Sequence, residues 1–151
     1  MLPTFKLRPI DHVAAALLFF GYTAALLATP DMGFTRDESF YFYAADQYKG
    51  WFVELAENHE RGDVRPSFTQ TAIDRHWSYN PEHPVLVKTA FALSGLLFHD
   101  KLDWLSRSEA YRLPGMVSGA LTVSCLYLFT LVAFRRRLAA VVASALLATM
   151  P

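Results

Sequence analysis

The chain has 151 residues, of which 53% are hydrophobic, 15% aromatic and 19% charged, and its formal net charge is zero. A charged fraction below the roughly 25% of an average soluble domain favours a membrane protein, and the even charge balance argues against nucleic acid as a partner. Three stretches, at residues 13–30, 113–134 and 138–151, contain no Asp, Glu, Lys or Arg. A soluble helical protein would have to bury such helices on all sides, which argues against that class.

The first stretch predicts a membrane-spanning helix from Val13 to Thr29, closed by Pro30. Its length is near the lower end of the about 17–25 apolar residues that a helix needs to cross a bilayer. Lys6 and Arg8 precede it, so the positive-inside rule places the N-terminus in the cytoplasm and the following residues outside. A cleaved signal peptide would also have a basic start and small residues such as those of "ALLATP". The length of the window and the later apolar stretches favour an uncleaved anchor.

The second predicted span is Leu113 to Phe134, and three arginines, Arg135 to Arg137, follow it directly. Three adjacent arginines indicate a cytoplasmic end, so this span runs from outside to inside. The stretch at residues 138–151, "LAAVVASALLATMP", then predicts the start of a third span. Because the chain stops within this apolar run, we expect it to be the N-terminal piece of a longer membrane protein.

Residues 31–111 therefore form one long external loop in the predicted topology, with helices near 37–56 and 84–98 and a polar connector between them. The stretch Pro84 to Phe98 is short for a span and carries Lys88, and a third crossing here would place the three arginines outside. We therefore expect both loop helices to be interfacial, lying against the outer face of the membrane.

The loop opens on "FTRDESFYFYAADQYKGWF", in which two adjacent carboxylates precede many aromatic residues. Thr35 and Glu38 have the spacing of a capping box, and Asp37 in the first turn complements the helix dipole. A structural role could explain the pair entirely. The aromatic residues, however, would hold this helix at headgroup depth, where the phosphate of a lipid-linked substrate lies. A carboxylate fixed there suits a general base.

Two further groups of residues admit both a structural and a functional interpretation. In "NPEHPVLVK", Glu82 and His83 are an acid and a metal-ligating type, and Lys88 is a cation that could pair with phosphate. Glu82 could equally favour the helix start at Pro84, with His83 merely exposed. Arg112, at the outer end of the second span, could snorkel to the headgroups or bind a phosphate through its planar fork.

Taken in chain order, three motifs resemble the start of a GT-C-type glycosyltransferase, and in particular the protein O-mannosyltransferase and aminoarabinose (lipid A) transferase families. "RDESFYFYAADQY" resembles the acidic motif of the first external loop, and "PEHPVLVK" is similar to the H-P-P-L-x-K stretch. "YRLPGMVSGALTV" resembles the R-L-P-S-x-L-x-G-x-L-T-V segment. The sequence departs from the pattern at Val85, where these families usually have a second proline.

The resemblance implies an all-α polytopic transmembrane bundle that moves a sugar, with inversion, from a polyprenyl-phosphate donor to an acceptor on the outer face. It implies that Asp37 is the general base and Glu38 its acidic neighbour. Phosphate binding would fall to Arg112 and Lys88, with His83 and Glu82 nearby; these last two are also candidate ligands for a divalent metal, although no cofactor is certain. The expected partners are the lipid-linked donor, membrane lipid and a glycan, lipid or protein acceptor.

The location implied by the resemblance is the bacterial inner membrane, with the catalytic loop in the periplasm. The alternative is a non-catalytic polytopic membrane protein, either a transporter or an envelope-assembly subunit. A transporter is expected to place ionisable or helix-breaking residues within its spans. Here the charges gather in the external loop instead, which favours chemistry on a lipid headgroup.

Overall fold

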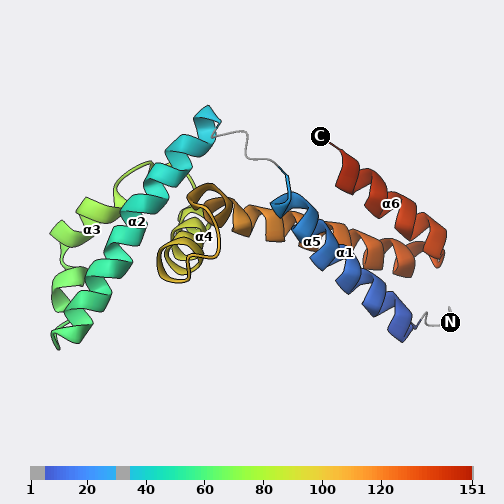
Figure 1. Ribbon diagram of the computed structural model, residues 1–151, viewed down its shortest axis with the longest axis horizontal. Coiled ribbons are helices and arrows are strands. Elements are labelled where there is room, and N and C mark those ends of the chain that lie inside the picture. The colour runs from blue at the N-terminus through green and yellow to red at the C-terminus, as the bar shows by residue number, and fades with distance from the viewer. Residues whose placement is uncertain (1–5, 30–34, 151) are drawn as a thin grey trace. The chain divides into compact units, whose positions relative to one another are not determined.

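The computed structural model describes residues 6–29 and 35–150, and every regular element in these ranges is helical (Figure 1). The elements in chain order are α1 (Pro9–Leu27), α2 (Arg36–Glu60), the 3₁₀ turn η1 (Arg65–Phe68), α3 (Gln70–Trp77), α4 (Val85–Ser94), the π-helical segment η2 (Gly95–Lys101), α5 (Arg107–Phe134) and α6 (Arg137–Thr149). The helical class predicted from the sequence is confirmed. Two of these helices, α1 and α5, are long and apolar enough to cross a membrane.

Most predicted helices are present, with shifted ends. The first loop helix continues to Glu60, four residues beyond the predicted end, and α5 begins at Arg107, before the predicted span. The predicted polar connector contains η1 and α3. The predicted closing Pro30, the start of the external loop and Pro151 lie outside the described residues.

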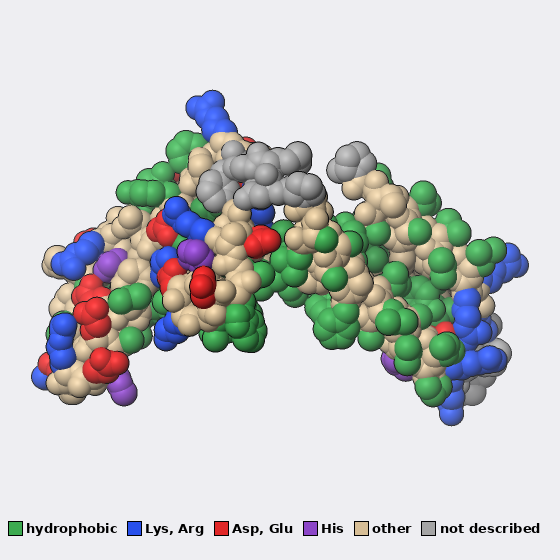
Figure 2. Space-filling model, in the orientation of Figure 1, with side chains coloured by type: hydrophobic (Ala, Val, Ile, Leu, Met, Phe, Trp, Pro, Cys, Tyr) green, Lys and Arg blue, Asp and Glu red, His purple; other side chains and the backbone are tan. Residues whose placement is uncertain are grey.

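The chain divides into two compact units, one formed by residues 1–30 and 115–151 and the other by residues 31–114. The first unit, with α1, most of α5 and α6, has a small core. Its buried members are Ala15, Tyr127, Leu131 and Ala140. Small residues let the helix backbones approach closely, and the Ser124 hydroxyl donates to the Ala15 carbonyl at 3.0 Å. Apolar side chains cover much of the outward surface of these helices (Figure 2).

An ion pair joins α1 to α6 at one end of this first unit. Asp11, only 1% exposed, accepts hydrogen bonds from Nε and Nη2 of Arg137 at 2.8 and 3.1 Å. The same carboxylate accepts from the Arg8 amide at 2.8 Å, which caps the first turn of α1. The pair therefore places the basic N-terminal segment and the start of α6 at the same end of the unit.

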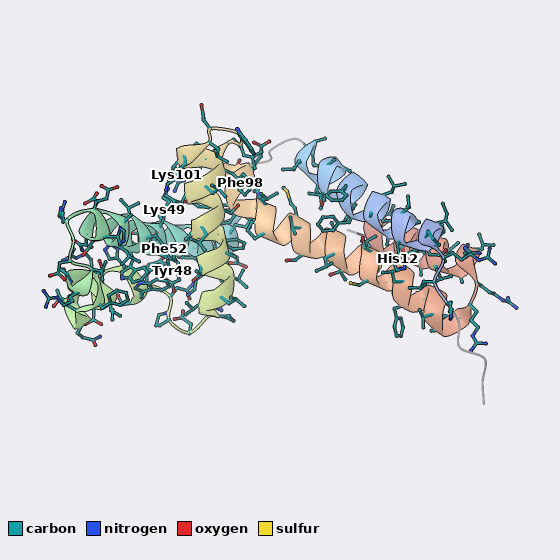
Figure 3. The ribbon with its side chains drawn as sticks, turned by 90° about the horizontal axis from the view of Figure 1, so that it is seen from below. His12, Tyr48, Lys49, Phe52, Phe98 and Lys101 are labelled. Carbon is teal, nitrogen blue, oxygen red and sulfur yellow. The ribbon has the colours of Figure 1, made fainter. Side chains whose placement is uncertain are left out.

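The second unit is built around α2, three of whose buried residues lie three positions apart. Phe42, Ala45 and Tyr48 of α2 pack with Ala92 of α4 and Tyr111 of α5. Figure 3 shows Tyr48 and its neighbour Lys49 on α2. The ring of Phe42 stacks on that of Tyr111 with centroids 5.3 Å apart. These contacts fix the first turns of α5 against α2 and α4.

Two details explain how α5 begins inside this second unit. A Cβ atom at Gly95 would lie 2.3 Å from Cε1 of Tyr111, so the close approach of the start of η2 to α5 requires glycine there. Pro114 lies inside α5 and has no N–H to donate to the carbonyl of Ala110, four residues earlier. The Ser94 hydroxyl of α4 donates to that carbonyl at 2.6 Å instead. The helix thus continues through the proline towards the predicted span.

Candidate functional site

The acidic pair lies at the N-terminus of α2, where the capping box predicted from the sequence is confirmed. The Glu38 amide donates to Oγ1 of Thr35 at 3.4 Å, and the Thr35 amide donates to Oε2 of Glu38 at 3.0 Å. Asp37 is exposed, whereas Glu38 is half-buried. The cap therefore fixes the first turn of α2 and separates the two neighbouring carboxylates into different environments.

Arg112 of α5 binds Glu38 through two hydrogen bonds. Its Nε donates to Oε1 at 3.0 Å and its Nη2 to Oε2 at 2.9 Å, the two-point geometry that suits an arginine fork and a carboxylate. This guanidinium lowers the pKa of Glu38 below its usual range, and the Thr35 amide also lowers that pKa. Glu38 is thus engaged by Arg112 and by the cap, and the catalytic role predicted for Glu38 stays a prediction.

Replacing Glu38 by glutamine is expected to lower the free energy of unfolding by about 1 kcal/mol at pH 7, since the pair is partly exposed, at 32% for Glu38 and 22% for Arg112. Glutamine keeps the capping geometry, so the loss reports the ion pair. Because the folded-state pKa lies below the ordinary 4.5, this stabilisation is present above that pH and disappears as the pH falls through the lowered pKa. Thermal unfolding of wild type and variant between pH 7 and pH 2 measures it. A stability difference that grows on acidification would contradict the pairing.

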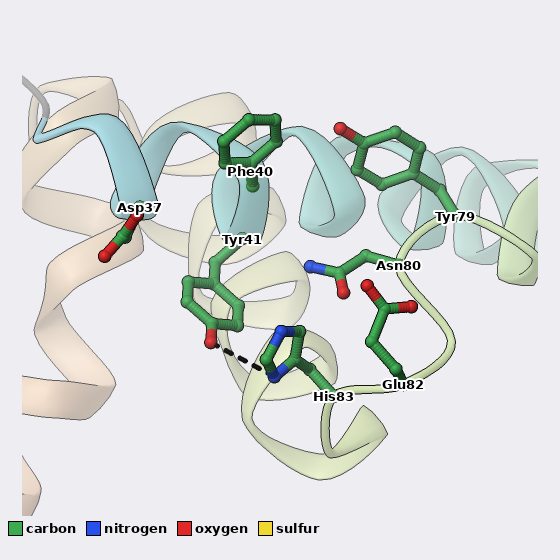
Figure 4. Close-up of a pocket in the computed structure, with 7 residues that line it drawn as sticks. All are labelled: Asp37, Phe40, Tyr41, Tyr79, Asn80, Glu82 and His83. Carbon is green, nitrogen blue, oxygen red and sulfur yellow. Dashed lines mark hydrogen bonds between the residues drawn. The ribbon is translucent and has the colours of Figure 1, made fainter.

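A cavity of about 550 Å³ opens between the first turns of α2 and the turn that precedes α4 (Figure 4). Three lining residues come from α2 and four from the turn; they are Asp37, Phe40, Tyr41, Tyr79, Asn80, Glu82 and His83. The spacing within α2 explains the first three, because residues at i, i+3 and i+4 share a helix face. The cavity thus brings together Asp37, Glu82 and His83, which the sequence singled out in two separate motifs.

Ring contacts hold two of the aromatic side chains in this cavity. The Tyr41 hydroxyl lies 3.4 Å from Nδ1 of His83, and the two rings meet edge to face with centroids 5.3 Å apart. Tyr43, on the next turn of α2, packs edge to face on Tyr79 at 4.7 Å. Rings held in this way by their neighbours form a partly preorganised wall.

Asn80 is the most unusual lining residue. Its φ is +54°, in the left-handed region, which asparagine tolerates better than most residues. Its Oδ1 atom is buried, and no described residue donates a hydrogen bond to it. Such an unpaired polar atom costs about 1–3 kcal/mol. Strained backbone and unpaired polar groups gather at functional sites, so Asn80 is a candidate that the sequence analysis did not identify.

Lys88 lies behind this turn. Its side chain is completely buried, and Nζ donates to the backbone carbonyl of Asn80 and lies 5.4 Å from the centroid of the Tyr48 ring. Within residues 6–29 and 35–150, no carboxylate forms an ion pair with it. The predicted phosphate-binding residues are therefore separated, since Arg112 contacts Glu38 and Lys88 supports the turn without lining the cavity.

The polar lining of the cavity is acidic. Asp37 and Glu82 bring two carboxylates, and the seven lining residues include no lysine or arginine. Glu82 and His83 were predicted as candidate metal ligands; among the described residues, no group of three or more His, Cys, Asp or Glu side chains gathers at a spacing suited to a metal ion. The arrangement can accept protons and hydrogen bonds from a neutral ligand, and its aromatic rings can contact a ring-shaped one.

Sequence reasoning missed four of the lining residues, Phe40, Tyr41, Tyr79 and Asn80. The helical spacing from Asp37 could have identified the first two, and the Asn80–Pro81 dipeptide is a recognised turn signal. Comparison with known proteins adds nothing to these assignments, because no family model, curated protein or solved structure matches the chain.

Proposed function

We propose that this protein is a membrane glycosyltransferase that moves a sugar from a polyprenyl-phosphate donor to an acceptor hydroxyl on the outer face of the membrane. The strongest support for this proposal is that Asp37 shares a cavity with Glu82 and His83, although they lie in motifs more than 40 residues apart. The resemblance of those same motifs to GT-C-type transferases supports it. So do the two helices long enough to span a membrane: α1 precedes this unit in the chain, and α5 begins within it.

In the proposed reaction, Asp37 accepts the proton of the acceptor hydroxyl while that oxygen attacks the anomeric carbon of the donor sugar. The bond between the anomeric carbon and the phosphate oxygen breaks, and both bonding electrons leave with the lipid phosphate. Attack from the face opposite the phosphate inverts the anomeric configuration. Asp37 suits this role because it is an exposed carboxylate at the cavity wall, whereas Glu38 is already bound by Arg112.

The leaving phosphate needs positive charge, which we assign to Lys88 and Arg112. The Lys88 ammonium supports this assignment because it is buried and no described carboxylate pairs with it, so a phosphate that reached it would not have to displace an ionic partner. The Arg112 guanidinium lies in the same unit and directs two of its N–H groups at Glu38.

The protein, purified from its own membrane into nanodiscs, is expected to release polyprenyl phosphate from donors carrying radiolabelled mannose, glucose or arabinose when a hydroxyl-bearing acceptor is added. The measurement is the appearance of labelled product together with free polyprenyl phosphate. Inverted configuration in the product supports attack opposite the phosphate. If release of label is equal with and without acceptor for all three donors, the protein is not a transferase of this class.

A further inference from the structure

The residues that line the cavity beside Asp37 favour an uncharged ligand over an anionic one. Its charged lining groups are two carboxylates, Asp37 and Glu82, and no lysine or arginine is among the residues that line it. A phosphate group placed there would meet two like charges and no lysine or arginine, and His83 is the one lining side chain that can become positively charged. The cavity is therefore unsuited to the anionic part of a lipid-linked donor. It suits a ligand that is uncharged and donates hydrogen bonds.

Asn80 supplies a second and independent indication of a donating ligand. Its amide oxygen is buried and receives no hydrogen bond from any described residue, so the protein itself does not fix this amide. The residue lines the cavity and is only half-buried as a whole. An amide in this state gains a hydrogen bond by turning towards a hydroxyl in the cavity, because a hydroxyl can donate to its oxygen and accept from its nitrogen.

The aromatic side chains add a shape requirement. Phe40, Tyr41 and Tyr79 line the same cavity, and Figure 4 shows the Phe40 and Tyr79 rings beside the polar groups of the turn. Tyr79 is held by Tyr43, and Tyr41 by His83. Rings fixed in advance lose little freedom when a flat ligand packs on them. A volume of about 550 Å³ lies within the usual 300–1,000 Å³ range of small-molecule sites.

From these three observations we propose that the cavity binds a neutral saccharide ring, whose C–H face packs on the aromatic side chains and whose hydroxyls bond to Asn80, Glu82 and Asp37. This would make the acceptor a glycan, and not a phosphorylated sugar or a protein side chain. The identification of the bound ring as the acceptor rests on the proposed function, whereas its binding does not.

The test measures binding of methyl mannoside, methyl glucoside and methyl arabinoside to the protein in nanodiscs by saturation-transfer NMR. Mannose 6-phosphate, glucose 6-phosphate and arabinose 5-phosphate are the charged counterparts. At least one neutral glycoside is expected to bind about tenfold or more tightly than its phosphorylated counterpart, since like charge across the cavity opposes the latter. Phosphorylated sugars that bind equally or better would overturn the proposal, as would a folded protein that binds none of the six.

The decisive variant is Asn80→Gly, because glycine adopts the left-handed conformation at no steric cost and removes the side chain that carries the amide. It is expected to weaken binding of the neutral glycoside about 5- to 30-fold, the loss of one or two hydrogen bonds. Asn80→Asp keeps the shape and adds a third carboxylate, so it should widen the preference for neutral over phosphorylated sugar. Ser78→Ala, two residues away and outside the cavity, is the matched control and should bind like wild type.

Wild-type affinity in Asn80→Gly would exclude Asn80 from the site. Transfer activity separates this inference from the proposed function. If transfer proceeds to a protein or lipid acceptor while no glycoside binds, the saccharide cavity is wrong and the transferase stands. If glycosides bind with the expected preference while no donor is consumed, the cavity stands and the transferase is wrong.

Discussion

Replacing Asp37 by asparagine is expected to slow sugar transfer by about 10²- to 10⁴-fold, the usual contribution of a positioned general base. Asparagine has nearly the same shape and keeps hydrogen-bonding capacity, but it cannot take the proton of the attacking hydroxyl. The side chain is exposed at the cavity wall and forms no part of the cap, in which Thr35 and Glu38 are the partners. The fold of the unit should therefore survive the change.

The measurement is the rate of labelled product formation at saturating donor, together with the thermal unfolding midpoint. Asp74→Asn is a matched control, because Asp74 is an exposed carboxylate on α3 that accepts a hydrogen bond from the Gln70 side chain at 2.7 Å and does not line the cavity. It should transfer sugar at the wild-type rate. Near-normal turnover of Asp37→Asn would remove Asp37 from the role of base, and equal losses in both variants would indicate a general effect of charge.

How well the sequence predicts a feature of this structure depends on how far apart in the chain the residues that determine it lie. The capping box at Thr35 and Glu38 spans four consecutive residues, and the apolar windows within α1 and α5 are continuous, so local rules suffice for them. The longer α5 shows where local rules fail. The predicted span begins at Leu113, but α5 begins at Arg107, because a hydroxyl on another helix accommodates Pro114 inside it.

The candidate site depends on contacts between distant residues, which a single sequence does not reveal. Arg112 was predicted to bind phosphate and Glu38 to assist catalysis, and the pairing of the two follows only from the packing of α5 on α2. Lys88 shows the same limit. Its place in "PEHPVLVK" predicts a cation that could pair with phosphate, and only the packing of α4 shows that it points inwards onto Tyr48 and the Asn80 carbonyl.

Lys88→Met is expected to lower transfer activity without lowering stability. A buried ammonium without an ionic partner is costly, and methionine fills a similar volume without charge. The midpoint of thermal unfolding should therefore equal or exceed that of wild type, although the bond to the Asn80 carbonyl is lost. Transfer should fall by about 10²- to 10³-fold, because the positive charge assigned to the leaving phosphate disappears.

Lys49→Met is the matched control for this substitution, since Lys49 lies on α2 in the same unit but pairs with Asp100 at 2.8 Å. Removing its ammonium leaves that carboxylate unpaired, so stability should fall by about 1 kcal/mol while transfer changes little. If Lys88 had a purely structural role, Lys88→Met would instead lower the midpoint of thermal unfolding. Transfer would then fall only in proportion to the fraction of protein that is unfolded. The sign of the stability change thus distinguishes the two roles. A lower midpoint indicates that Lys88 stabilises the fold, and an equal or higher midpoint with lost transfer indicates that it binds an anion.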